Sequence, residues 1–120
     1  MSRLLIVDDE PGVLSVLSIA FRQAGYEVRT AANPFRAMEL CATEAFDAIL
    51  SDVQMPGIDG HSLVRWVAGV YPNMRSILMS GYDLPCGNCP YEGRCKRMQK
   101  PFLPKDAVET VRQALAATVD

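Results

Sequence analysis

Five polar side chains stand at or just beyond the ends of short apolar runs, and their types are suited to chemistry. Asp8 and Asp9 follow the first run, Asp52 and Ser80 end two later runs, and Lys100 follows the last. Carboxylates bind hard divalent cations, and a carboxylate can also act as a nucleophile. A hydroxyl and an ammonium group can stabilise the oxygens of a transferred phosphoryl group. These residue types therefore suit phosphoryl transfer if the fold brings them together.

Apolar runs alternate along the chain with segments of helical spacing. The run at residues 4–7 is continuously apolar, which is typical of a strand buried on both faces. Helical segments begin near Pro11, at Asn33 before Pro34, and at Gly60. This alternation predicts an α/β fold, a doubly wound parallel sheet with helices on both faces. The expected strands are 3–7, 26–31, 48–52, 75–79 and a short one around Met98, and the expected helices are 11–24, 33–43, 60–71 and 104–118.

Parallel strands place their carboxyl ends at one edge of the sheet, where open α/β sheets bind their ligands. The five polar residues are therefore expected to converge. Three carboxylates close together repel one another, so they must either take up protons or share a cation such as Mg²⁺. A cation and Lys100 beside Asp52 would then favour attack of the Asp52 carboxylate on a phosphoryl group. Taken singly, such residues are more often caps or solvated loop residues, and only their joint occurrence favours a site.

Composition sets limits on partners and location. The 120 residues are 49% hydrophobic and 22% charged, which predicts one globular domain spanning residues 1–120. The net charge of −2 gives no electrostatic case for binding nucleic acid. The first apolar run is too short for a signal peptide or a membrane span, so we expect no membrane association and a cytoplasmic location.

Three of the four cysteines form a cluster, Cys86-x₂-Cys89-x₅-Cys95, in a segment rich in proline and glycine. The frequency of these residues predicts an irregular loop rather than a helix. Three interpretations stay open. The cysteines bind Zn²⁺ or an iron–sulfur cluster, they form a redox disulfide, or they are unlinked thiols.

Four motifs together resemble the receiver domain of response regulators in two-component signalling, across nearly the whole chain. They are Leu5-Ile6-Val7-Asp8-Asp9-Glu10, Asp52 with Met55-Pro56-Gly57-Ile58-Asp59-Gly60, Ser80-Gly81, and Lys100-Pro101-Phe102. The resemblance implies a five-stranded sheet of flavodoxin-like order 2-1-3-4-5.

The resemblance also implies roles for individual residues. Asp52 would be the phosphoacceptor, Ser80 the switch hydroxyl, and Lys100 the partner of the phosphoryl group. The implied Mg²⁺ ligands are Asp8, Asp9, Asp52 and the backbone carbonyl of Gln54. The phosphodonor would be a histidine kinase or a phosphotransfer protein, and phosphorylation would switch binding to a downstream protein target. Such a receiver is not an enzyme beyond catalysing its own phosphorylation and dephosphorylation.

The sequence departs from this family at two places. The family's fourth helix is replaced by the cysteine-rich segment, and Arg97 stands where an aromatic residue usually reports phosphorylation. An alternative function is therefore a metal- or redox-responsive interaction module with a receiver-like fold. A haloacid-dehalogenase-like phosphatase would need an acid at position 54, where this chain has Gln54. The chain is expected to be either a stand-alone receiver or the receiver part of a longer protein.

Overall fold

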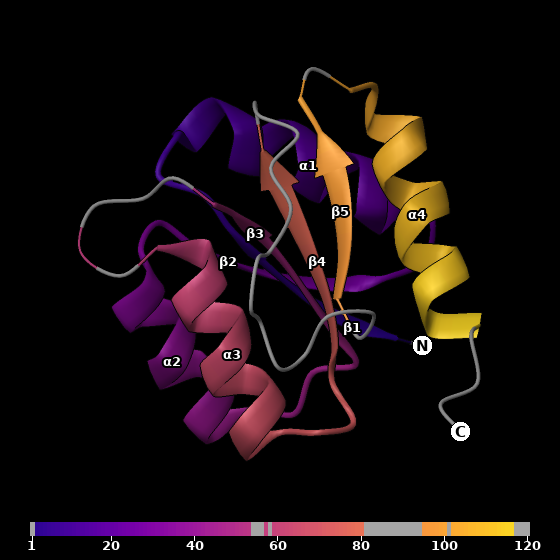
Figure 1. Cartoon of the computed structure of the whole chain (residues 1–120). Helices are drawn as coiled ribbons and strands as arrows, with labels where there is room; N and C mark the ends of the chain where they lie inside the picture. The colour runs from indigo at the N-terminus through magenta and orange to yellow at the C-terminus, as the bar shows by residue number, and fades with distance from the viewer. Residues whose placement is uncertain (1, 54–56, 58, 81–94, 101, 117–120) are drawn as a thin grey trace.

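The computed structural model describes residues 2–53, 57, 59–80, 95–100 and 102–116, with no side-chain description for 61 and 95–97. Strands and helices alternate along the described chain (Figure 1). The strands are β1 (Arg3–Val7), β2 (Glu27–Ala31), β3 (Ala48–Asp52), β4 (Arg75–Ser80) and β5 (Cys95–Gln99), and the helices are α1 (Pro11–Gln23), α2 (Pro34–Thr43), α3 (Gly60–Val70) and α4 (Pro104–Ala116).

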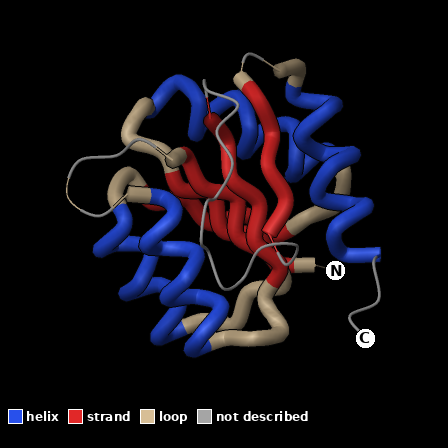
Figure 2. Tube along the Cα trace, in the orientation of Figure 1, coloured by secondary structure: helices blue, strands red, loops and turns tan. Residues whose placement is uncertain are grey.

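The five strands form one sheet in the order β2-β1-β3-β4-β5, and every neighbouring pair is parallel. This confirms the doubly wound α/β fold and the strand order that the resemblance implied. Helices α1 and α4 cover one face of the sheet, and α2 and α3 cover the other (Figures 1 and 2).

The sheet has an apolar layer on each face because its central strands are apolar throughout. In β1, Leu4 and Ile6 pack in the cluster under α1 and α4, whereas Leu5 and Val7 pack in the cluster under α2 and α3. All four side chains have 0% exposure. The continuous apolar run therefore reflects burial on both faces, as predicted.

The helix ends follow from capping residues that the sequence contains. The Asn33 side chain accepts a hydrogen bond of 2.8 Å from the Arg36 N–H, and Asp59 accepts one of 2.8 Å from the Ser62 N–H. Helix α1 ends before Gly25, whose φ of 96° is a conformation that favours glycine.

The last part of the sheet differs in one respect from the sequence prediction. Cys95, placed by its neighbours in an irregular loop, is the first residue of β5 and pairs with Ser76 of β4. Pairing with β4 therefore overrides the local composition. The predicted absence of the family's fourth helix concerns residues 81–94, which lie outside the described residues. Over the described chain, no helix combines the length and apolar character needed to cross a membrane.

Among the described residues, Phe21 is the largest fully buried side chain, and it anchors α1 against the sheet. Its ring also packs edge to face on Tyr26, with a centroid distance of 5.4 Å. We expect Phe21→Ala to lower the free energy of unfolding by about 3–5 kcal/mol, because it removes a buried ring and leaves a cavity. Urea unfolding would measure this. Ile19 lies on the same helix but is 57% exposed, so Ile19→Ala should lower the free energy of unfolding by no more than about 0.5 kcal/mol. Equal costs would show that α1 is not anchored through Phe21.

Candidate functional site

The register of the sheet aligns the ends of its central strands. Val7 of β1 pairs with Ser51 of β3, so the residues that follow them, Asp8 and Asp52, lie at the same edge. On the other side of β3, Asp52 pairs with Met79. Ser80 in turn pairs with Gln99, the residue before Lys100. The predicted residues therefore converge because each follows its strand to the carboxyl edge of one parallel sheet.

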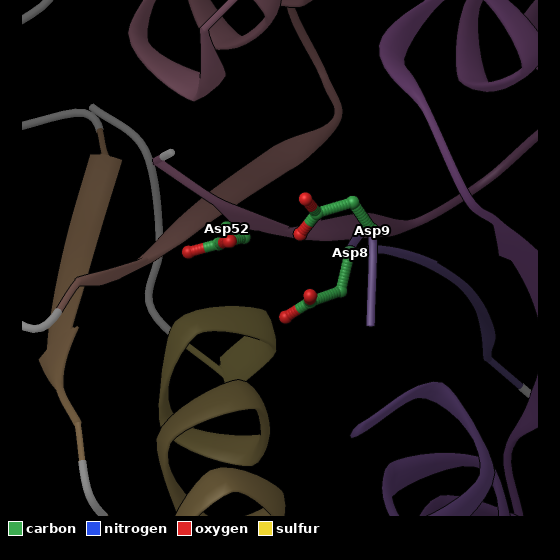
Figure 3. Close-up of side chains that lie close together, drawn as sticks. All are labelled: Asp8, Asp9 and Asp52. Carbon is green, nitrogen blue, oxygen red and sulfur yellow. The ribbon is translucent and has the colours of Figure 1, made fainter. Parts of the chain in front are cut away.

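Three carboxylates meet at this edge. Asp8, Asp9 and Asp52 each offer an oxygen within 4.8 Å of the other two. Figure 3 shows the Asp8 and Asp9 side chains leaving adjacent positions of the chain, with both carboxyl groups on the side where Asp52 lies. Asp8 is fully buried and Asp52 is 6% exposed, whereas Asp9 is exposed. Two carboxylates are thus held in the low-dielectric part of the site, where their mutual repulsion is strongest.

Lys100 bridges the two buried carboxylates. Its Nζ lies 3.2 Å from Asp52 Oδ1 and 3.3 Å from Asp8 Oδ2. Burial alone would lower the pKa of Lys100, but the charges of Asp52 and Asp8 outweigh burial and raise this pKa above its ordinary value. The ammonium group therefore stays charged at neutral pH. A backbone hydrogen bond of 2.6 Å from the Lys100 N–H to the Ser80 carbonyl fixes this residue to the end of β4.

The segment after Asp52 returns to the same edge through a close backbone contact. Val53 donates to the Met79 carbonyl, and Gly60 donates to the Val53 carbonyl at 2.8 Å. A Cβ on Gly60 would lie 2.2 Å from the Asp52 carbonyl oxygen. Only glycine fits at position 60 without moving the backbone that carries Asp52. This constraint has no signal in the local sequence, because it depends on the close approach of the start of α3 to the end of β3.

The three carboxylates suit Mg²⁺. The ion prefers oxygen ligands at about 2.0–2.1 Å, so two of its ligands lie at most about 4.2 Å apart. The carboxylate oxygens already lie within 4.8 Å of one another. Two of the three carboxylates are buried, unlike an ordinary acidic surface cluster. Lys100 donates to two of these carboxylates, and a cation that shares their oxygens would relieve the repulsion among them.

Other predicted site residues are placed only in part. Ser80 ends β4 at the same edge, beside Lys100. Gln54 lies outside the described residues, as do Cys86 and Cys89, and only the backbone of Cys95 is described. The remaining cysteine, Cys41, is a core thiol, and burial raises its pKa to about 11.

A parallel five-stranded sheet with an acidic site at the carboxyl ends of β1 and β3 is the arrangement that the resemblance to receiver domains implied. The sequence profile of the response regulator receiver domain matches residues 4–112. The chain therefore belongs to the response regulator receiver domain family. Receiver domains are signalling modules of two-component systems that interact with histidine kinases or phosphotransfer proteins and bind Mg²⁺ at their acidic pocket.

Characterised relatives agree with this assignment. Sporulation initiation phosphotransferase F of Bacillus subtilis is 34% identical over 80 residues, 67% of this chain and 64% of that protein. The DNA-binding transcriptional regulator NtrC of Escherichia coli is 32% identical over 113 residues, 92% of this chain but 24% of that protein. The chain thus spans less than two thirds of these two proteins. The response regulator receiver protein CpdR of Brucella abortus is 29% identical, with coverage of 98% and 99%.

Solved structures show the same fold. A CheY-like receiver domain from Methanospirillum hungatei matches with a TM-score of 0.87 at 27% identity, covering 96% of this chain and 94% of that one. The response regulator TrrA of Thermotoga maritima, described as a complex with Mg²⁺ and BeF, matches with a TM-score of 0.85 at 26% identity, covering 95% and 99%. These comparisons confirm the predicted receiver function and give no support to the metal- or redox-responsive alternative or to Zn²⁺ or iron–sulfur binding.

The crowding of carboxylates makes a prediction about Asp9. In metal-free buffer, we expect Asp9→Asn to raise the free energy of unfolding by about 1 kcal/mol, because it removes one of three mutually repelling charges. Mg²⁺ at 100 times its dissociation constant should stabilise the wild-type protein by about 2.7 kcal/mol and the variant by much less. Urea unfolding with EDTA and with Mg²⁺ would measure both effects.

Glu39→Gln is the control for this prediction, because it removes an exposed negative charge on α2 without touching the site. It should leave the Mg²⁺ effect unchanged. Equal stabilisation of the wild type and of Asp9→Asn by Mg²⁺ would exclude Asp9 as a ligand.

Proposed function

We propose that Asp52 is the phosphoacceptor of this receiver domain and that Asp8, Asp9 and Asp52 hold its Mg²⁺. One observation carries the proposal: Asp52 is a nearly buried carboxylate that faces two further carboxylates and the Lys100 ammonium group at the carboxyl edge of a parallel sheet. Gln54 stays the predicted source of a further ligand, its backbone carbonyl.

Asp52 supplies the nucleophile. One of its carboxylate oxygens attacks the phosphorus in line with the leaving group, and a new P–O bond forms as the bond from phosphorus to the donor nitrogen or oxygen breaks. The product is an aspartyl phosphate. Asp52 is only 6% exposed, so the nucleophile itself is nearly buried before the reaction.

Lys100 is already aimed at the reacting group. Its Nζ donates to Asp52 Oδ1 at 3.2 Å. After transfer, the same ammonium group can donate to an oxygen of the phosphoryl group on Asp52. Asp8 accepts from the Glu10 N–H at 2.9 Å and from Lys100, which fixes its carboxylate beside Asp52. When bound, Mg²⁺ would supply positive charge to the phosphoryl oxygens. Ser80, at the end of the next strand, would act as the switch hydroxyl.

The direct test is phosphorylation by acetyl phosphate with Mg²⁺. We expect intact-protein mass spectrometry to show one phosphoryl adduct on the wild-type protein and none on Asp52→Asn, which keeps the shape of the side chain but lacks the nucleophilic oxygen. Ser51→Ala, which alters the preceding residue of β3, should still form the adduct. An adduct on Asp52→Asn, or none on the wild type, would refute the assignment.

A groove beside the site is suited to the phosphodonor protein. It has a volume of about 580 Å³ and is bordered by the start of α1, the segment before α4, and Lys100. Its lining is mainly apolar: Glu10, Gly12, Val13, Val16, Leu17, Lys100, Phe102 and Pro104. Val16 and the neighbouring Leu103 are 52% and 56% exposed. Residues 11–21 carry no charged side chain, so this surface is unusually apolar for the outside of a helix.

The groove is continuous with the phosphoacceptor site because Lys100 belongs to both. A donor protein that presents a phosphohistidine to Asp52 would cover the carboxyl edge of the sheet and could bury this apolar border. We therefore assign the groove to the histidine kinase or phosphotransfer protein.

Two phosphodonors, a histidine kinase and acetyl phosphate, test the groove and the reaction at Asp52 separately. We expect Val16→Glu to slow transfer from a phosphorylated histidine kinase by about tenfold, since a charge in an apolar contact costs about 1–3 kcal/mol. Acetyl phosphate, which needs no docking surface, should react at the wild-type rate. The kinase used would be the one that phosphorylates the wild-type protein fastest. The transfer rate would be measured as the loss of radioactive phosphate from that kinase.

Val70→Glu is the matched control, since Val70 is 51% exposed at the far end of α3. It should not slow the kinase reaction. If Val16→Glu and Val70→Glu behave alike, the kinase docks elsewhere.

The remaining parts of the proposal concern the chain as a whole. We take residues 1–120 as one receiver domain. This is supported by the single five-stranded sheet, which has an apolar core cluster on each of its two faces. It would catalyse only its own phosphorylation and dephosphorylation and act by binding a downstream protein rather than nucleic acid. Its cytoplasmic location stays a prediction.

A further inference from the structure

A pocket rich in arginine lies beside β2, the strand at one edge of the sheet. Its volume is about 390 Å³, and three guanidinium groups but only one carboxylate line it. We call it the arginine pocket. The residues that line it come from β1, the end of α1 and the start of β2: Arg3, Arg22, Tyr26, Glu27, Val28 and Arg29.

The arginine pocket is separate from the acidic site. Arg3 is the first residue of β1 and pairs with Glu27, the first residue of β2. Asp8 follows the last residue of β1. A strand rises about 3.3 Å per residue, so the backbones of Arg3 and Asp8 lie roughly 16 Å apart. A ligand in the arginine pocket would therefore not touch the carboxylates around Asp52.

Arg3 forms a fixed wall of the pocket. Its Nε lies 3.1 Å from a carboxylate oxygen of Glu27, and its Nη1 donates to the Ala45 carbonyl at 3.1 Å. Its Nη2 pairs with Glu44, and the guanidinium group lies over the Phe46 ring, 5.5 Å from the ring centroid. All three nitrogens of this group have protein partners, so Arg3 supplies position and charge rather than unused donors.

Arg22 and Arg29 differ from Arg3 because most of their donors are not used by the protein. Arg29 Nε donates to Glu44 at 3.1 Å. Arg22 Nη2 reaches the Val28 carbonyl at 3.4 Å, which is longer than the usual range of about 2.7–3.2 Å. Within the described part of the chain, each of these two groups makes this one hydrogen bond. Since a guanidinium group carries five N–H donors, both groups can still bind an anion.

We propose that the arginine pocket binds a small anion with two phosphate groups, of which inorganic pyrophosphate is the simplest. Arg22 and Arg29 come from different elements, α1 and β2, so each can bind one phosphate group through paired N–H donors. The charge of the lining favours an ionic ligand over an apolar one. This inference goes beyond the proposed function and does not depend on the role of Asp52.

The test is isothermal titration calorimetry of the whole chain with pyrophosphate, at physiological ionic strength and with EDTA. We expect the wild type to bind a single pyrophosphate, and Arg22→Gln and Arg29→Gln each to bind about tenfold more weakly. Both side chains are exposed, so these variants should fold. Arg36→Gln is the matched control, because Arg36 is a 56% exposed arginine on α2, outside the pocket. It should bind as tightly as wild type.

Glu27 provides a change in the opposite direction. It is the carboxylate of the lining, and its side chain is 57% exposed. Its charge would repel a bound diphosphate, so Glu27→Gln should tighten pyrophosphate binding by about fivefold. Glu39→Gln removes an equal charge on α2 and should leave the affinity unchanged. Weaker binding by Glu27→Gln would contradict the proposed site.

The position of the ligand can be checked by amide chemical shifts in NMR spectra recorded during the same titration. The largest changes should fall on residues 22–29. Changes centred on Asp8, Asp52 and Lys100 would place pyrophosphate in the acidic site and overturn the inference. Absence of binding by the wild type at millimolar pyrophosphate would also overturn it, as would equal losses in Arg36→Gln and Arg22→Gln. The arginines would then serve only to keep other strands from pairing with β2.

ADP distinguishes two sources of the diphosphate group. Tighter binding of ADP than of pyrophosphate, with the same dependence on Arg22 and Arg29, would support a nucleoside diphosphate as the ligand. Weaker binding of ADP would support a free diphosphate. ADP binding that neither Arg22→Gln nor Arg29→Gln weakens would count against the pocket. No phosphodonor is used in these titrations, so their result is independent of whether Asp52 accepts a phosphoryl group.

Discussion

One ammonium group shared by two buried carboxylates is the interaction on which this site depends. Lys100 lies within 3.3 Å of oxygens on both Asp8 and Asp52, and Asp9 adds a third carboxylate nearby. Three carboxylates this close repel one another, and a divalent cation that shares their oxygens would relieve that repulsion. Under the proposed function, transfer of a phosphoryl group to Asp52 would add negative charge at the same place, so the phosphorylated form would depend still more on the positive charges of Lys100 and the cation. The same crowding would then account both for cation binding and for the response to phosphorylation.

The parallel sheet makes this crowding possible and also made it predictable. Asp8, Asp52 and Lys100 each follow a strand, and parallel pairing aligns the carboxyl ends of neighbouring strands. Apolar runs and helix caps therefore determined both the fold and these three positions. The constraint on Gly60 could not be assigned in this way, because it comes from the approach of two segments that are not adjacent in sequence. A Cβ at position 60 would lie 2.2 Å from the carbonyl oxygen of Asp52. Cys95 was misplaced for a similar reason, since pairing with Ser76 decides its conformation more than its neighbours do.

The apolar groove that includes Val16 lies on the face covered by α1 and α4 and reaches Lys100. Lys100 also contacts Asp52, so the groove and the site share one residue. Under the proposed function, a protein donor would therefore meet the site from this face. The charge of Lys100 and the apolar lining beside it would contribute in different ways, because only Lys100 contacts Asp52.

If Asp52 is the phosphoacceptor, as proposed, its depth separates two contributions to the reaction. Its carboxylate is only 6% exposed, so the groups that act on it directly are those around it. A small acyl phosphate would need only these groups, and its reaction would measure their arrangement. A protein donor would also contact the surrounding surface, and its reaction would depend on residues such as Val16 as well. Specificity for a particular donor would then change through such residues without altering the chemistry at Asp52.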